Sequence, residues 1–457
     1  MKIPDDQLLS HGPIPRAIGS IAIPMLIMML TAISFNWLDA WYISRLGEAE
    51  LTAIDIAFPL ITFSSSIIFG GVGTGVSAAI AAYHASKDKA SKALALRYGL
   101  GLALLIAFII TLAITFGGRQ LLAMQNDNPA ILDLSYTYCF WYFLLLPVMA
   151  IGATISAAMR GTGNAARPMV FSIIAMITDA VLTPFFTYSV ETSWYSSLFL
   201  GLGIKGAALS TNVSYIVLTL LLLWDVRREK QGLDFSTPTN AHPNKQKILK
   251  RILATSLIAA LVPMITNLII GFSQSLLAQR GTAMLDAFSL SKRFEQFLIM
   301  LCIPVCAATM ITISASQSHG LQERIQKTLK YSIKLLVSCS ALLAVFMYFG
   351  SDLWFKAFTS KTEIFAEGAS YFGHAFLHIV FLPLTLLINF AFQGISKPER
   401  PLPISISSII VFQGLACYLI VSQGYASSWY YALLSLSTPL TFCLCYLLFK
   451  RQSLIKG

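Results

Sequence analysis

Apolar runs of 20 or more residues recur from one end of this 457-residue chain to the other. Each run is long enough to cross, as an α-helix, the roughly 30 Å of hydrocarbon in a bilayer. Only 12% of the residues are charged, about half the share of a typical soluble domain. The alternating pattern of outer-membrane β-strands is missing from the sequence. The chain is therefore predicted to be an all-α polytopic membrane protein.

We expect about twelve transmembrane helices. They run roughly over Ala17–Tyr42, Leu51–Ala78, Ala93–Thr115, Ile131–Ala157, Pro168–Tyr188, Leu198–Asp225, Ile252–Ala278, Ala283–Ser314, Leu329–Phe349, Gly368–Phe392, Leu402–Val421 and Ser427–Phe449.

The net charge is +11, and the positions of the Lys and Arg residues agree with this expected topology. The termini and the segments that follow even-numbered spans hold 24 of the 32 Lys and Arg residues. By the positive-inside rule both termini are then cytoplasmic, and the chain is expected in the plasma membrane, the inner membrane of a bacterium. The surplus charge needs no nucleic-acid partner. Since the first sixteen residues are polar and the first span is long, we expect no cleavable signal peptide.

The longest polar stretch, residues 227–250, divides the chain into halves of about six spans each. We expect an N-lobe over residues 1–226, a cytoplasmic linker over 227–250 and a C-lobe over 251–457. The halves echo each other: Arg160-Gly161 precedes Arg167-Pro168, and Gln393-Gly394 precedes Arg400-Pro401. Because each half has an even number of spans, the repeat is parallel. It predicts two lobes related by a pseudo-two-fold axis along the membrane normal, V-shaped around a central cavity.

Two acids lie inside the predicted spans of the N-lobe. Asp39 is near the end of the first span and Asp179 is in the middle of the fifth. A carboxylate at bilayer depth is costly and usually marks an ion or substrate path. Thr183 follows Asp179 by one turn, Asn36 precedes Asp39 by three residues, and Thr211 of the sixth span adds a hydroxyl.

We interpret these five residues as one ion-coupling cluster. Two carboxylates in a low dielectric do not readily both stay ionised, so the pair would share a proton or hold a small cation such as Na⁺. The alternative is two unrelated acids with separate hydrogen-bond partners. Pro24 and Pro184 lie in the first and fifth spans, where each is expected to bend its helix.

A second group of charges lies at the start of the eighth span. Lys292 or Arg293 can pair there with Asp286 or Glu295, which favours a structural or outer-gate ion network. His374 and His378 are four residues apart in the tenth span. Without a carboxylate in an HExxH arrangement we interpret them as ordinary hydrogen-bonded histidines. The seven cysteines lack metal-site spacing, and no metal site is expected.

The glycine-rich segment Gly70–Gly75 looks like a phosphate-binding loop but lacks the Lys-Ser/Thr ending and lies inside a span. Tight helix packing or bending explains it better.

Several segments match a known family in order and spacing. They are Pro24; Asp39 before Ile43-Ser44-Arg45-Leu46-Gly47; Met159-Arg160-Gly161-Thr162-Gly163 before Arg167-Pro168; and Leu202-Gly203-Ile204-Lys205-Gly206-Ala207-Ala208-Leu209-Ser210-Thr211. On these segments the chain resembles the multidrug and toxic compound extrusion (MATE) transporters over nearly its whole length. The resemblance implies two six-helix lobes and cation-driven export of amphipathic organic cations and related drugs.

Within that family, one branch keeps its essential acids in the N-lobe, and Asp39 falls on its first-span Asp. The fifth span of that branch reads Asn, then Asp four residues later, then Pro. Here the corresponding residues are Asp179 and Thr183 before Pro184, so the acid has moved by one turn. Another branch uses a Glu in the seventh span and an Asp in the tenth, where this chain has no carboxylate. The resemblance therefore implies coupling through the N-lobe.

The leading hypothesis is a secondary active multidrug antiporter, not an enzyme, that needs no cofactor and uses H⁺ or Na⁺ as its coupling ion. Its substrates would be small amphipathic compounds, and it would act in the bilayer as a monomer. The substrate cavity is expected to include Phe35, Trp37, Met149 and Met176. A flippase for lipid-linked precursors is the alternative within transport, and a membrane enzyme is the alternative outside it.

Overall fold

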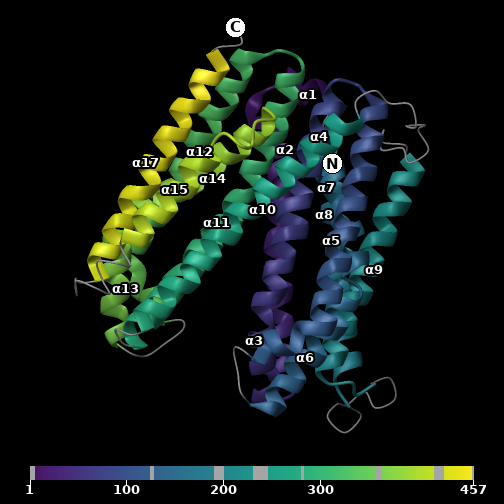
Figure 1. Cartoon of the computed structure of the whole chain (residues 1–457), viewed down its shortest axis with the longest axis vertical. Helices are drawn as coiled ribbons and strands as arrows, with labels where there is room; N and C mark the ends of the chain where they lie inside the picture. Colours follow the sequence, from purple (N-terminus) through teal and green to yellow (C-terminus); the bar gives the residue numbers. More distant parts are fainter. Residues whose placement is uncertain are drawn as a thin grey trace. The chain divides into compact units, whose positions relative to one another are not determined.

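The computed structural model describes residues 6–123, 128–189, 200–229, 245–278, 282–356, 362–415 and 427–454 (Figure 1). Every element in these ranges is helical. They are α1 (Asp6–Ser10), α2 (Ile14–Ser44), α3 (Glu48–Ser65), the π-helical η1 (Ser66–Val72), α4 (Gly73–Ala85), α5 (Lys89–Ala123), α6 (Pro129–Leu144), α7 (Leu146–Gly161), α8 (Ala166–Thr187), α9 (Ile204–Glu229), α10 (Lys245–Ala278), α11 (Thr282–Ser318), α12 (Gln322–Lys356), α13 (Thr362–His374), α14 (Phe376–Gly394), α15 (Leu402–Ser408), the π-helical η3 (Ile409–Gln413) and α17 (Ser427–Leu454).

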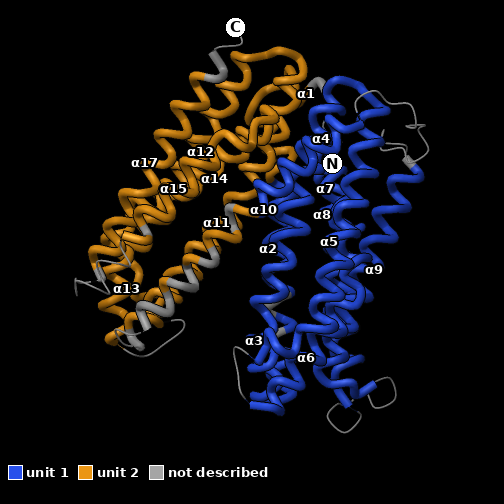
Figure 2. Tube along the Cα trace, in the orientation of Figure 1, with its two compact units in different colours: residues 1–4, 23–260 blue, residues 5–22, 261–457 orange. Residues whose placement is uncertain are grey.

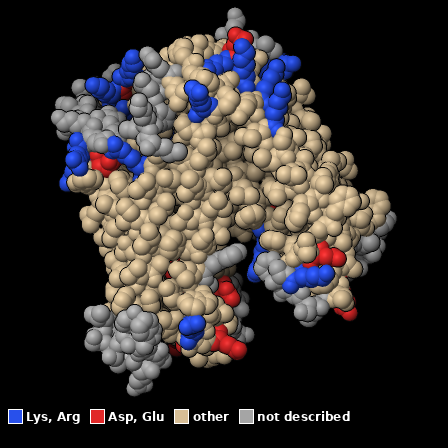
Figure 3. Space-filling model, turned by 180° about the vertical axis from the view of Figure 1, so that it is seen from behind, with Lys and Arg blue, Asp and Glu red and all other residues tan. Residues whose placement is uncertain are grey.

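The described part of the chain contains 10 helices that are long and apolar enough to span a membrane, or 11 if α6 and α7 form one bent span. Large apolar side chains cover the outer surface: Phe116 and Phe349, for example, are 79% and 82% exposed. Figure 3 shows broad uncharged surface between separate groups of charged side chains on the face that it draws. Such surfaces suit hydrocarbon rather than water. The chain is a multi-pass membrane protein.

The helices form two compact units (Figure 2). The first unit comprises residues 23–260 and the second comprises residues 5–22 and 261–457. The first residues of α2 thus pack with the second unit, and the first residues of α10 pack with the first unit. Most of the linker expected at 227–250 lies outside the described residues, so the lobe boundaries placed around it stay a prediction.

Glycines let α10 approach closely inside the first unit. A Cβ atom on Gly71 would lie 2.9 Å from Cβ of Ala260, and one on Gly75 would lie 2.2 Å from Oγ of Ser256. Neither site has room for a larger residue. The interpretation of the glycine-rich segment as a packing surface is confirmed, and η1 within it also departs from α-helical geometry.

The two units each contain a helix that ends in the same way, and the two ends lie 233 positions apart in the chain. Gly161 ends α7 and Gly394 ends α14. A Cβ atom on Gly161 would lie 2.6 Å from the carbonyl oxygen of Ser77, and one on Gly394 would lie 2.8 Å from that of Met310. Ser77 and Met310 are also 233 positions apart. Each glycine therefore lets its helix touch the equivalent neighbour, α4 or α11.

The turns after these helices match as well. Gly163 and Ser396, again 233 positions apart, have positive φ angles of 86° and 61°. The amide of Asn164 donates to the carbonyl of Met159 at 3.0 Å, and that of Lys397 donates to Phe392 at 2.9 Å. A second pair of turns, at Lys87 and Gly320, has φ angles of 57° and 71°. The internal repeat predicted from the sequence is confirmed in these backbone details.

The sequence predicts the fourth and tenth spans as single helices, but in the structure each of them is divided into two helices. The fourth divides into α6 and α7, which meet at an angle of 51°. The break falls at Leu145, because Pro147 has no amide hydrogen to continue the helical ladder and instead starts α7. The tenth divides into α13 and α14 at Ala375, eight residues before Pro383. The end of the eleventh predicted span, residues 416–421, lies outside the described residues.

Candidate ion-coupling site

Asp39 of α2 and Asp179 of α8 meet inside the first unit, although 140 positions separate them in the chain. The carboxyl group of Asp39 lies against the carboxyl group of Asp179 and against the hydroxyl of Thr183. Asp179 is only 8% exposed. The structure therefore brings together three of the residues predicted to form one cluster.

Each acid keeps one oxygen without a hydrogen-bond donor. The Oδ1 atoms of Asp39 and Asp179 are both buried and accept no hydrogen bond from a described residue. Buried polar atoms in proteins are almost always satisfied. Two such atoms on neighbouring carboxyl groups form a place where a proton or a small cation would supply the missing interaction.

Hydroxyl groups from α8 and α9 surround Asp179. Thr183 Oγ1 lies 2.8 Å from Ser210 Oγ, and both hydroxyls, with that of Ser214, face Asp179. Thr211 is not among the hydroxyls that face Asp179. Its Oγ1 atom donates to the carbonyl of Ala207 at 3.2 Å, as does Ser210 Oγ at 2.8 Å. Ser210, one position earlier, takes the place next to Thr183. The side chain of Asn36 lies outside the described residues.

Three tyrosines, of which Tyr138 is buried and the other two are half-buried, complete the surroundings and were missed by the sequence reasoning. Tyr138 of α6 lies near both Asp39 and Asp179, while Tyr142 of α6 and Tyr215 of α9 lie near Asp179. Tyr138 is 9% exposed. The one available sequence signal was the four-residue spacing of Tyr138 and Tyr142, which puts two hydroxyl-bearing rings on the same face of a helix.

The residues predicted to line a substrate cavity come from three helices of the first unit, α2, α7 and α8. Met149 is buried in the core of the first unit, with 1% exposed. Phe35 and Met176 are half-buried, and the side chain of Trp37 lies outside the described residues. Their role as a cavity lining stays a prediction.

The two prolines expected to bend helices lie inside continuous helices. Pro24 is within α2, next to the boundary between the two units, and Pro184 is within α8. Pro184 cannot donate to the carbonyl of Ala180, so a backbone oxygen is released one residue after Asp179.

In the charged group at the start of the eighth span, one of the expected ion pairs is formed and the others are not. Glu295 pairs with Lys292, whose Nζ atom lies 2.8 Å from Oε2. His378 and Tyr371 also contact Glu295. Among the described ion pairs, neither Asp286 nor Arg293 takes part, because Arg293 is exposed while Glu295 is buried on another face of α11. The tertiary partners His378 and Tyr371 replace them.

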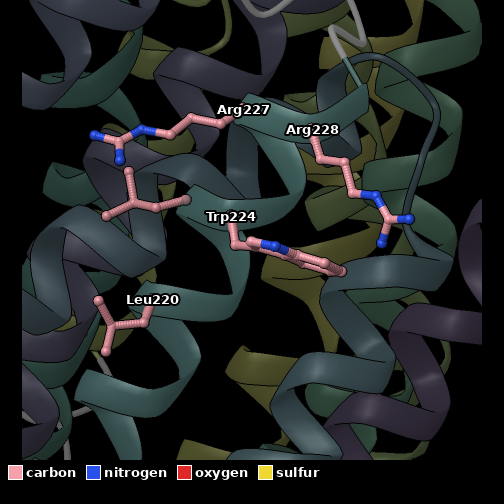
Figure 4. A pocket seen from close by; sticks show the side chains of 5 residues that line it. Leu220, Trp224, Arg227 and Arg228 are labelled. Atoms are coloured by element: carbon pink, nitrogen blue, oxygen red, sulfur yellow. The ribbon is translucent and has the colours of Figure 1, made fainter.

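One pocket, of about 420 Å³, lies beside the end of α9 (Figure 4). It is lined by Leu220, Leu223, Trp224, Arg227 and Arg228, whose spacing puts them along one side of the helix. The Arg228 guanidinium lies over the Trp224 ring, 5.0 Å from its centre. Arginine and tryptophan at a helix end are typical of a membrane–water interface. None of the predicted coupling or cavity residues lines this pocket.

The MatE family model matches residues 24–185 and 248–419, well over half of the chain. The chain belongs to the MatE family. The family predicted from the sequence motifs is therefore confirmed, and the two matched segments leave out the region of the predicted linker.

Curated relatives of this MatE chain are transporters. It is 24% identical over 412 residues to the FAD transporter of Shewanella oneidensis, covering 88% of this chain and 86% of that protein. It is 18% identical over 332 residues to the multidrug resistance protein MdtK of Yersinia pestis, covering 72% of this chain and 71% of that protein. These relatives are membrane transporters rather than enzymes.

The fold is likewise that of MATE transporters. A solved outward-facing multidrug resistance MATE transporter of the MOP superfamily has a TM-score of 0.88 to this MatE chain, with 21% identity and 100% of each chain covered. The predicted all-α polytopic fold is confirmed.

Proposed function

We propose that the chain is a cation-coupled antiporter that exports amphipathic organic compounds, with Asp39 and Asp179 as its ion-coupling residues. The observation that carries the proposal is the pair of adjacent carboxyl groups whose buried Oδ1 atoms accept no hydrogen bond from a described residue. Intramembrane acids of this kind usually serve ion pathways.

The proposed cycle uses the charge of this pair. A proton or Na⁺ entering from outside neutralises part of the negative charge, so the contact between α2 and α8 no longer carries two repelling carboxylates. The resulting change in hydrogen bonding near Thr183 and Pro184 favours release of substrate to the outside. Loss of the ion toward the cytoplasm restores the charged pair. The membrane potential supplies about 2.3 kcal/mol per charge per 100 mV.

A proton is the preferred coupling ion. The described neighbours of the pair are hydroxyl groups of Thr183, Ser210, Ser214 and Tyr138, which can each donate to a carboxylate as well as accept. These hydroxyl groups can therefore hydrogen-bond to the acid pair whether or not it carries a proton. Na⁺ would need several of these oxygens to act as ligands together with the two carboxylates.

Two substrate classes have support from relatives. MdtK of Yersinia pestis is a multidrug resistance protein, which favours amphipathic drugs. The Shewanella oneidensis relative is an FAD transporter and is matched over more of the chain, so a flavin dinucleotide is the second candidate substrate. Export of a lipid-linked precursor remains the alternative for a chain that moves neither.

The test is transport by the purified chain in proteoliposomes, with an imposed pH gradient and, separately, an imposed Na⁺ gradient. A cationic dye and FAD are measured side by side. We expect dye transport driven by the pH gradient and lost in Asp39→Asn and in Asp179→Asn. Asp352→Asn is the matched control, because Asp352 is an exposed acid of α12. Full transport in both site variants would refute the proposal, and transport that requires Na⁺ would change the coupling ion.

A further inference from the structure

A second buried polar cluster lies in the second unit, around Glu295 of α11. Glu295 is 5% exposed. The Lys292 Nζ atom donates to both carboxylate oxygens, at 3.0 Å to Oε1 and 2.8 Å to Oε2. The Tyr371 hydroxyl of α13 donates to Oε1. The carboxylate is therefore well supplied with donors and neutralised by one ammonium group.

His378 of α14 is the incompletely satisfied member of this cluster. It is 5% exposed, and its Nε2 atom lies 3.3 Å from Glu295 Oε1. Neither ring nitrogen makes a hydrogen bond to a described residue. A histidine that only fills space is normally hydrogen-bonded. A ring nitrogen this close to a buried carboxylate is placed to gain a charge-assisted hydrogen bond when the imidazole takes up a proton.

The cluster's other neighbours are aromatic and uncharged. Lys292 Nζ lies 5.3 Å from the centre of the Phe288 ring and 5.7 Å from that of Tyr371. From α17, Tyr430 and Tyr431 lie close to Tyr371. From α12, which also packs against α14, Ser340 donates to the carbonyl of Val380. Among the described residues, Glu295 thus faces Lys292, His378 and Tyr371, and Tyr371 in turn faces Tyr430 and Tyr431.

The internal repeat relates this cluster to the site in the first unit. Tyr371 is 233 positions after Tyr138, the same interval that separates Gly161 from Gly394. Tyr138 lies near Asp39 and Asp179, while Tyr371 contacts Glu295. Equivalent tyrosines therefore face buried carboxylates in both units. The first unit has two acids at this place, whereas the second has one acid with two basic residues.

We propose that His378 is a proton-binding residue of a second site, in which the bound proton and the Lys292 ammonium compete for Glu295. Proton uptake converts the neutral imidazole into an imidazolium and breaks no covalent bond. With Lys292 and His378 both charged, one carboxylate would serve two cations in an apolar interior, which is costly. Each proton bound to His378 thus weakens the hold of Lys292 on Glu295.

This competition is reciprocal and makes signed predictions. Removal of the Lys292 charge leaves Glu295 for His378 alone, so the proton binds more tightly. Removal of the Glu295 charge leaves His378 beside a cation, so the proton binds less tightly. Proton binding to His378 is therefore expected to be stronger in Lys292→Met and weaker in Glu295→Gln than in the wild type.

The test is a pH titration of the purified full chain in detergent micelles, with ¹⁵N-labelled histidine rings followed by NMR. The chain has six histidines, and the signal lost in His378→Gln identifies His378. His374, which is exposed and whose Nδ1–H donates to the carbonyl of Ser370 at 2.8 Å, is the internal control. Its midpoint should stay constant in both variants.

The titration covers about pH 4.5 to 9, the range over which a histidine can change its charge. The proposal would be overturned if the His378 signal did not titrate in this range. A midpoint that fails to rise in Lys292→Met would also overturn it, even if Glu295→Gln does not fold. The proposal concerns proton binding and does not rest on the proposed transport cycle. The same titration in an Asp39→Asn background should be unchanged, so failure of one proposal leaves the other to be judged separately.

Discussion

Thr183 Oγ1 and Ser210 Oγ lie 2.8 Å apart and join α8 to α9 beside Asp179. This contact sets the polar surroundings of the acid pair, because Ser210, Thr183 and Ser214 all face the Asp179 carboxyl group. Neither hydroxyl belongs to the helix that carries Asp39. A change in the charge of the pair is therefore transmitted to α8 and α9 as well as α2.

Ser210→Ala removes one donor from this shell. A hydroxyl donor favours the ionised form of a carboxyl group, so its loss makes the acid pair hold a proton more strongly. We expect the pH of half-maximal export to rise by about one to two units, since a hydrogen bond to a charged group contributes about 1.5–3 kcal/mol and one pH unit corresponds to about 1.4 kcal/mol.

Export measured in proteoliposomes across a pH series checks this shift. Ser338→Ala is the control, because the Ser338 hydroxyl donates to Lys334 within its own exposed helix face. An unshifted profile in Ser210→Ala, with normal protein levels, would separate Ser210 from the coupling ion.

The glycines of the internal repeat should be equally intolerant of a side chain. Gly161→Ala and Gly394→Ala each place a methyl group within 3 Å of a neighbouring backbone oxygen. Overpacking of this kind costs about 1–3 kcal/mol. We expect both variants to lower the melting temperature of the purified protein in detergent by similar amounts.

Gly101→Ala is the matched control for that measurement. Gly101 lies within α5 and has nothing within 4 Å of its added methyl group. Alanine is favoured over glycine in helices, so this variant should be neutral or slightly more stable. Unequal sensitivity of Gly161 and Gly394 would argue that the two contacts do not serve equivalent roles.

The predicted membrane orientation can be tested with two exposed lysines. Lys89 begins α5 and Lys356 ends α12. The positive-inside rule places Lys89 on the cytoplasmic side and Lys356 on the opposite side. In a cysteine-free background, Lys356→Cys in intact cells should react with an impermeant maleimide, and Lys89→Cys should react only after permeabilisation. The reverse pattern would invert the topology.

The acid pair could be predicted because charged residues in long apolar runs stand out from their surroundings. Asp39 and Asp179 carry that signal individually, and the helical spacing adds Thr183. Tyr138 could not be recognised, since an aromatic residue in an apolar helix usually serves packing. The sequence analysis names Thr211, whereas the rotation of α9 against α8 brings the neighbouring hydroxyl, that of Ser210, to Thr183.

The contacts of Glu295 show the same limit over a longer range. Lys292 is three residues away and was recognised as a possible partner from helical spacing alone. His378 and Tyr371 come from other helices, and no local pattern links them to Glu295. Similarly, Pro147 marked the fourth span, but the complete break at Leu145 depends on how α6 and α7 pack.

The central claim is that Asp39 and Asp179 exchange a coupling ion for substrate. The most direct measurement is proton release on addition of a cationic dye to the purified protein in weakly buffered detergent solution, with a pH indicator as readout. We predict a release that saturates with dye in the wild type and disappears in Asp39→Asn and Asp179→Asn, with Asp352→Asn unchanged. Dye binding with undiminished proton release in both site variants would contradict the account.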